Sequence, residues 1–228
     1  RDVMRNLLSS LFFILIFVGL GAMAFAAAPR GQETAQPAAG VNVQAETNEA
    51  AAPAATYNWN AIALPLDTGV TLASELASYI DSSGSVVRAA KWNASPPSWV
   101  IWNPTNPRTS VDFSVGVGSP VLVAVDSSAS YTSASLVGDV PPQGDVKYSL
   151  TLDAWNFIMV PLDQTGNFSD AEGLANDIGG VDKAAYWNQN GSWVIWDRNN
   201  PRTSVNFTVQ AGYPYMIKAG TTTPTIWP

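Results

Sequence analysis

The chain contains an internal repeat, which constrains its fold more than any other feature of the sequence. Residues 98–113 read SWVIWNPTNPRTSVDF, and residues 192–207 read SWVIWDRNNPRTSVNF. A match of this length within one chain indicates one structural unit used twice. Each unit must then build its core from the same kinds of residue.

The repeat extends well beyond this block. Copy one opens with NWNAIALPLD at residues 58–67, and copy two opens with AWNFIMVPLD at residues 154–163. Between the copies lies DVPPQGD, a linker rich in Pro and Gly. We therefore predict repeat 1 at residues 57–138, a linker at 139–147 and repeat 2 at 148–228. Each repeat has about eighty residues, a size consistent with independent folding.

Hydrophobic periodicity predicts one short helix and several strands in each copy. Ser169 to Glu172 has the S-x-x-E form of a capping box, and apolar residues then recur at helical spacing. In copy one, Thr71 is the expected cap. Segments of copy two that read as strands are YSLTL, WNFIMVPL, AAYW, WVIW, SVNFTV and YPYMIKA. The predicted class is α+β, mainly antiparallel β, with two similar small β-sandwich or barrel-like repeats, each with one short helix.

The N-terminal region has the layout of an export signal. Met4 and Arg5 precede the apolar run LFFILIFVGL, and Ala24-Phe25-Ala26 offers a cleavage site of small residues. This predicts a signal peptide at residues 1–26, cleaved after Ala26, and a secreted or cell-surface protein. The alternative is an uncleaved anchor, because the apolar stretch could cross a bilayer about 30 Å thick. Residues 27–56 are rich in Ala and Pro and lack aromatics, so we expect a disordered spacer.

Composition excludes several classes of chemistry. The chain has no cysteine and no histidine. Disulfides, His-dependent catalytic triads and ordinary zinc sites are therefore excluded. The net charge of −7 is unsuited to nucleic acid, which needs clustered Lys and Arg. We expect no metal, no cofactor and no nucleic-acid partner, and membrane contact only through an uncleaved signal segment.

The order of motifs resembles a tandem repeat module of exported bacterial and archaeal surface proteins. Such modules open with a strand similar to GWNLISLPL and finish with a GYPY strand. The residues that carry the resemblance are Trp59 to Leu66, Trp155 to Leu162, and Gly212 to Tyr215. Copy one departs from it at Gly118 to Val121, where the aromatics are missing. The resemblance implies an exported, β-rich repeat protein and implies no defined role.

Each copy carries four tryptophans at matching positions: Trp59, Trp92, Trp99 and Trp102, and Trp155, Trp187, Trp193 and Trp196. Burying one tryptophan removes about 200 Å² from water and contributes on the order of 5 kcal/mol, so most belong in a core. In the WVIW strand, Trp99 shares a face with Ile101, and Val100 shares the other face with Trp102. Either the strand is covered on both faces, or one Trp faces outward as a platform for sugar rings.

Arginines also recur although basic residues are scarce: Arg108 and Arg202 lie in matching NPRTS turns. Each either braces its own turn, over a Trp face or beside a carboxylate, or contacts a ligand. The candidate ligand-binding residues are Trp102, Arg108, Trp196, Arg202, Tyr213 and Tyr215.

Carboxylates offer weaker candidates. Only Asp67 and Asp163 recur cleanly, whereas a glycosidase needs two acids at a defined separation. Asp163, Asn167, Asp170 and Glu172 have oxygen ligands suited to calcium, but helix capping already explains the last two. We expect a non-enzymatic structural or adhesive protein that contacts extracellular polysaccharide or cell-envelope proteins. The first alternative is a glycan-binding module, and the remote one is an acid-pair hydrolase.

Overall fold

The computed structural model describes residues 14–17, 57–129, 133–164 and 166–228. The predicted spacer lies outside these residues, as does most of the predicted signal peptide. The four residues of the predicted signal peptide that are described form strand β1 (Ile14–Phe17), which pairs antiparallel with β6 (Ser133–Leu136). In the described part of the chain, neither α1 (Ala73–Ile80) nor α2 (Ala171–Ile178) is long and apolar enough to cross a membrane.

The main body consists of two four-stranded antiparallel sheets, one in the N-terminal half (residues 57–138) and one in the C-terminal half (148–228). The N-terminal sheet has the order β2-β5-β3-β4. Its strands are β2 (Tyr57–Ala63), β3 (Val86–Ala94), β4 (Pro97–Trp102) and β5 (Pro120–Asp126).

The C-terminal sheet has the order β8-β11-β9-β10, so both sheets run from the opening strand at one edge to the WVIW strand at the other. Its strands are β8 (Trp155–Met159), β9 (Val181–Trp187), β10 (Trp193–Asp197) and β11 (Pro214–Ala219). A short 3-10 helix η1 (Leu162–Gln164) follows β8, and β7 (Tyr148–Ser149) pairs with β12 (Ile226–Trp227). The prediction of a mainly antiparallel β structure with two helices is confirmed.

Two local predictions were wrong. The segment SVNFTV is not a strand of the sheet, because its backbone pairs with the start of α2 and the residues before it: Ala171 N–H donates to Phe207 O (2.9 Å) and Val209 N–H donates to Ser169 O (2.9 Å). The predicted strand over YSLTL is reduced to β7, and beyond it the Asn156 amide holds both backbone groups of Thr151.

The helix starts also differ from the prediction. Asp170, not Ser169, is the N-cap of α2, and its Oδ1 accepts from Gly173 N–H at 2.8 Å. At α1 the N-cap position is Leu72, and the Glu75 carboxylate reaches back to the backbone of Thr71 (2.8 Å) and Leu72 (3.2 Å). These hydrogen bonds hold the pKa of Glu75 below its usual value. Carboxylates therefore satisfy the exposed N–H groups at both helix starts.

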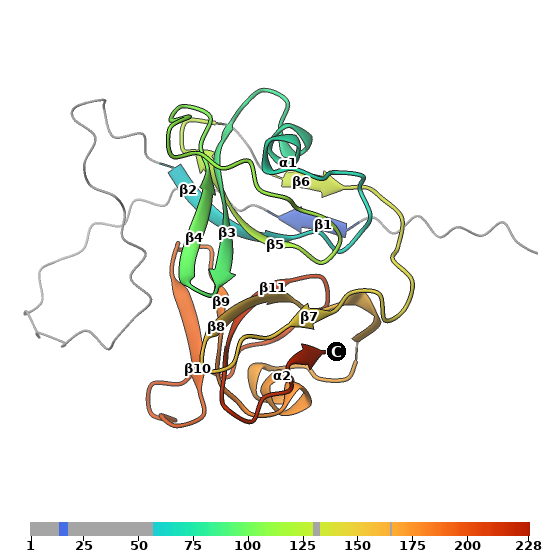
Figure 1. Cartoon of the computed structure of the whole chain (residues 1–228), viewed down its shortest axis with the longest axis vertical. Coiled ribbons are helices and arrows are strands. Elements are labelled where there is room, and N and C mark those ends of the chain that lie inside the picture. The colour runs from blue at the N-terminus through green and yellow to red at the C-terminus, as the bar shows by residue number, and fades with distance from the viewer. Residues whose placement is uncertain (1–13, 18–56, 130–132, 165) are drawn as a thin grey trace, which may run out of the picture.

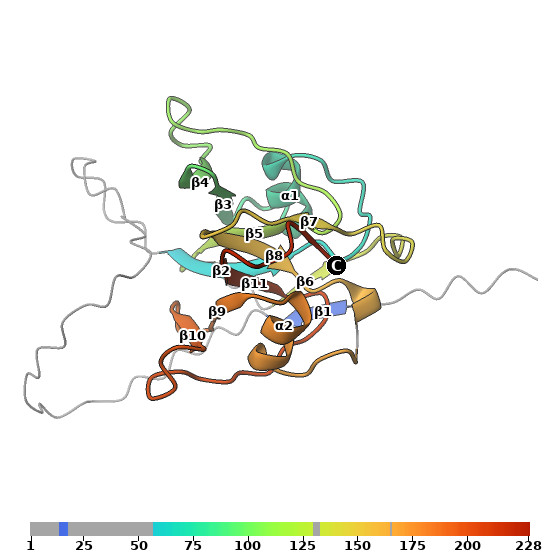
Figure 2. The ribbon, with the colours of Figure 1, turned by 60° about the horizontal axis from the view of Figure 1, so that its bottom comes forward.

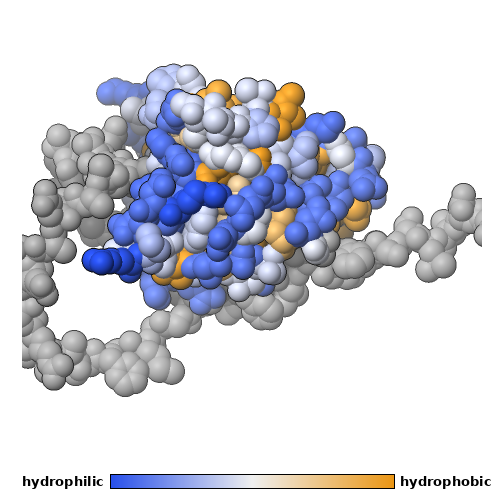
Figure 3. All heavy atoms as spheres, turned by 90° about the horizontal axis from the view of Figure 1, so that it is seen from below, coloured by the Kyte–Doolittle hydropathy of each residue, from blue (hydrophilic) through white to orange (hydrophobic). Residues whose placement is uncertain are grey.

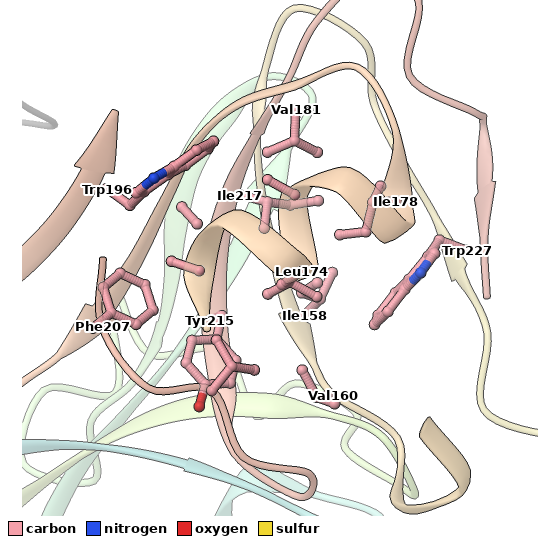
Figure 4. Close-up of a cluster of buried hydrophobic side chains, with 14 of the residues drawn as sticks. Ile158, Val160, Leu174, Ile178, Val181, Trp196, Phe207, Tyr215, Ile217 and Trp227 are labelled. Atoms are coloured by element: carbon pink, nitrogen blue, oxygen red, sulfur yellow. The ribbon is translucent and has the colours of Figure 1, made fainter. Parts of the chain in front are cut away.

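Each helix covers the outer face of its own sheet. Leu174 and Ile178 of α2 pack against Ile158 and Ile217 of the strands, as Figure 4 shows. In the N-terminal half, Leu76 of α1 belongs to the corresponding core. The inner faces of the two sheets turn toward each other, so the helices lie outermost and the sheets between them (Figures 1 and 2). Residues from both halves form one cluster there, which positions the site described next.

Candidate functional site

Six half-buried tryptophans gather between the two sheets, and we call them the tryptophan cluster: Trp59, Trp92, Trp99, Trp155, Trp187 and Trp193. Two hydrogen bonds cross between the halves. Trp92 Nε1–H donates to Trp155 O (2.7 Å), and Trp187 Nε1–H donates to Trp59 O (2.8 Å). Trp92 matches Trp187 in the repeat, and Trp59 matches Trp155, so the two bonds are one contact made in both directions.

One phenylalanine breaks the equivalence of the two halves. The Phe157 ring lies edge-on to Trp99 of the other half (5.9 Å between centroids) and to Trp193 of its own half (6.3 Å). The matching position in the N-terminal half is Ala61, which belongs to the same cluster. One large and one small side chain thus occupy the two equivalent positions.

The WVIW strands contact core side chains on both faces. Trp99 and Trp193 lie in the tryptophan cluster. On the opposite face, Trp102 packs against the N-terminal helical core, and Trp196, only 6 % exposed, lies within the C-terminal one. Because side chains alternate along a strand, the first tryptophan of each WVIW strand lies on the inner face and the second on the helix-covered face.

Two of the candidate ligand-binding residues lie in the core. Besides Trp196, Tyr215 is buried, and its ring stacks on Phe207 with 6.0 Å between centroids. Its hydroxyl oxygen accepts from Gln210 N–H (2.9 Å), and burial raises its pKa to about 12. Neither residue offers an exposed face for a sugar ring.

The remaining candidates do not form one site. Trp102 is half-buried, whereas Arg108, Arg202 and Tyr213 are exposed. The NPRTS turns are braced by serines: Ser110 Oγ accepts from Asn103 N–H (2.8 Å), and Ser204 Oγ accepts from Asp197 N–H (2.7 Å). Of the six candidates, two thus lie in the core, one is half-buried and three are exposed.

The expected arginine over a tryptophan face does exist, but it is Arg198. Its guanidinium carbon lies 5.4 Å from the ring centroid of Trp196. It also donates to Val181 O (3.1 Å) and to Asn176 Oδ1 (2.8 Å). The matching of arginines between the copies does not point to it, because copy one has Pro104 at that position.

Each half also presents an exposed apolar pair, one residue within its WVIW strand and one directly after its NPRTS turn. We call each pair an edge patch. In the N-terminal half the pair is Ile101 and Val111, 37 % and 52 % exposed. In the C-terminal half it is Ile195 and Val205, 39 % and 51 % exposed. The backbone joins each pair: Val111 N–H donates to Ile101 O (2.9 Å), and Val205 N–H donates to Ile195 O (3.0 Å). The NPRTS turn with its exposed arginine precedes each valine directly in the chain.

The recurring carboxylates hold loops. Asp67 Oδ1 accepts from Gly69 N–H (3.2 Å), and its backbone pairs with Asp139. Asp163 Oδ2 accepts from Gly144 N–H of the linker (2.8 Å). Among the described residues, no group of three or more acidic side chains could hold a metal ion.

One ion pair lies at the end of the C-terminal sheet, where Lys183 Nζ stands 2.9 Å from Asp197 Oδ2. Partial burial acts to raise the pKa of Asp197. The Lys183 ammonium and the backbone N–H groups of Asn199 and Asn200 outweigh it and hold this pKa below its usual value. The pair ties β9 to β10 on an edge strand.

A groove of about 520 Å³ lies where the linker meets both halves. Charged side chains of both signs line it, among them Asp67, Asp139 and Lys147. The Tyr148 hydroxyl at its wall donates to Gly118 O (2.6 Å) and accepts from Met159 N–H (3.1 Å). The hydroxyl of this first residue after the linker therefore joins the C-terminal half to Gly118 of the N-terminal half.

The chain matches no protein-family model, no curated protein and no solved structure. The resemblance to an exported repeat module therefore stays a prediction.

Proposed function

We propose that this protein is an exported, non-enzymatic structural or adhesive protein of the cell surface. In this proposal two tandem repeats, each a four-stranded sheet with one helix, pack as a β-sandwich and present two equivalent contact edges. The observation that carries it is the pair of edge patches, which agree in residue identity, exposure and backbone hydrogen bond.

The matching exposed residues need a reason that core packing does not supply. Single exposed apolar side chains are common on soluble proteins. Some other exposed positions differ between the copies, such as Pro104, which corresponds to Arg198, and Asp112, which corresponds to Asn206, whereas the exposed Arg108 and Arg202 match. The edge patches keep Ile and Val in both copies. A surface used for contact accounts for this, because apolar area that is covered on binding contributes to affinity.

The surroundings favour contact with a surface over capture of a small molecule. Seen from below in Figure 3, the surface is largely hydrophilic, and apolar side chains gather in small separate patches. Two weak contacts on one rigid body strengthen each other, because binding at one edge raises the effective concentration of the other. Cell-envelope proteins or extracellular polysaccharide are the proposed partners.

Binding of the purified protein to isolated cell envelopes tests the proposal. Changing Val111→Asp together with Val205→Asp is expected to lower retention more than tenfold, and each single change is expected to lower it much less. Val140→Asp with Ile226→Asp is the matched control, because these side chains are 51 % and 59 % exposed outside the edge patches. Equal retention of all variants would rule out adhesion through the edges.

The same preparation separates the glycan alternative. Titration with envelope polysaccharide should leave tryptophan emission unchanged, because Trp196 lies in the core and the cluster tryptophans are half-buried between the sheets. Saturable emission changes that Arg108→Ala and Arg202→Ala abolish would favour a glycan-binding module instead. Mass spectrometry of the exported chain checks for cleavage after Ala26.

A further inference from the structure

The tryptophan cluster is an interface to which each half contributes its own set of side chains. The N-terminal half contributes Trp59, Trp92 and Trp99 from β2, β3 and β4. The C-terminal half contributes the matching residues from β8, β9 and β10. Among the residues that the structure describes, no strand runs from one sheet into the other. The contact therefore depends on proximity of the two faces and not on which chain carries them.

We propose that the two halves can exchange between copies: where the linker does not hold the closed form, the N-terminal half of one copy pairs with the C-terminal half of a second copy through this same interface. The partner is thus another molecule of this protein in exchanged form. The reciprocal hydrogen bonds of Trp92 and Trp187 form unchanged, because each joins one half to the other. Such exchange links copies without any new contact surface.

Phe157 and Ala61 select the unlike half as the partner. Two N-terminal halves would place alanine at both equivalent positions and leave a cavity where the Phe157 ring lies between Trp99 and Trp193. Two C-terminal halves would place phenylalanine at both and crowd the same space. Only the unlike pair supplies one ring for the gap.

The linker decides whether the pair forms within one chain or between two. Gly144 N–H of the linker donates to Asp163 Oδ2 (2.8 Å), and Tyr148 OH, directly after the linker, donates to Gly118 O (2.6 Å), so these contacts hold the closed form. Val146 packs so closely on Gly118 that a β-carbon there would lie 2.7 Å from Val146 Cγ1. A chain too short to follow this path has to place its second half on another molecule.

Deletion of residues 141–144 in the full chain tests the proposal, since it removes about 13 Å of reach at 3.3 Å per residue. Its control replaces the same residues with Ser-Gly-Ser-Gly, which keeps the length and the glycine at 144. Light scattering after size-exclusion chromatography is expected to give a monomer for the control and a dimer for the deletion. A deletion variant that is folded and monomeric at every concentration overturns the proposal.

The folding of the deletion variant and the affinity of its dimer are measured as well. If the deletion variant is unfolded when dilute, circular dichroism should show folding as concentration rises, and unfolded protein at all concentrations also overturns the proposal. In the dimer, Trp92→Phe with Trp187→Phe should raise the dissociation constant roughly tenfold or more. Val111→Asp with Val205→Asp should leave it unchanged. The reverse result would assign the dimer to the edge patches and reject exchange.

Discussion

Replacing Phe157 with alanine tests whether the two halves share one aromatic gap. The side chain is buried (9 % exposed) and its ring touches one tryptophan from each half. Removing a buried phenylalanine costs about 3–5 kcal/mol, through lost burial and the cavity left behind. We expect Phe157→Ala to lower the free energy of unfolding by this amount, a large share of the roughly 5–15 kcal/mol typical of a domain.

Ala61→Phe in the same chain should restore part of this loss. The new ring starts from the equivalent position on β2, which packs against the same cluster from the other sheet. On its own, Ala61→Phe is expected to cost about 1–3 kcal/mol, because the Phe157 ring already fills the gap. In the double variant we expect a favourable coupling of at least about 1 kcal/mol, as found for side chains in direct contact.

Urea unfolding followed by tryptophan emission measures all four members of this cycle, with linear extrapolation to water. Phe113→Ala is the matched control, because Phe113 is equally buried (7 % exposed) but lies in the N-terminal helical core. Ala61→Phe should not rescue it. If the losses of Phe157→Ala and Ala61→Phe add to within about 0.5 kcal/mol, the two positions do not share a gap and the argument for unlike pairing fails.

Three other predictions concern single contacts. Trp187→Phe removes the donor to Trp59 O and should lower the free energy of unfolding, measured in urea, by about 1–3 kcal/mol. Trp227→Phe should lower it less, because the Asp177 carboxylate that loses its donor is exposed to water. Gly118→Ala combines a φ of +81° with the contact to Val146 and should lower the free energy of unfolding by at least about 2 kcal/mol. Gly84→Ala, where φ is +86° and the space is open, should lower it by about 1 kcal/mol. Equal losses of thermal stability would contradict the close linker packing. Because the folded-state pKa of Asp197 is lowered, its stabilisation is present above the unfolded-state pKa of about 3.9 and is lost as pH falls below it. Urea midpoints between pH 6 and pH 2.5 should therefore fall less steeply for Asp197→Asn than for the unchanged chain, and parallel curves would show that the Lys183 pair contributes nothing to folding.

The periodicity of the sequence predicted the fold class and most strands, because alternation and helical spacing are local properties. It predicted a strand at Val205 to Val209 wrongly for the same reason. Phe207 and Val209 are buried as alternation requires, but their backbone partners are Ala171, the first residue of α2, and Ser169, which precedes the helix. Which segment satisfies a backbone group is a tertiary choice that periodicity does not contain.

The candidate site was harder to predict than the fold. Their matching positions predicted Trp196 and Tyr215 as ligand-binding residues, yet both are buried because α2 packs over that face of the sheet. Arg198 went unnoticed because it occurs in one copy only. The tryptophan cluster had a visible signal in the matched tryptophans and in the Ala61 and Phe157 pair, but a single repeat read by itself gives no sign that its inner face meets the other copy.

The reciprocal tryptophan contacts have a consequence for how the chain is made. Synthesis delivers the N-terminal half first, with Trp59, Trp92 and Trp99 on a face that nothing yet covers. The covering strand β11 ends at Ala219, well after β5 ends at Asp126. At roughly 5–20 residues per second, the first face waits on the order of 5–20 s for its partner. During that interval the nascent chain carries its greatest risk of aggregation, and a second chain close by could provide the missing face.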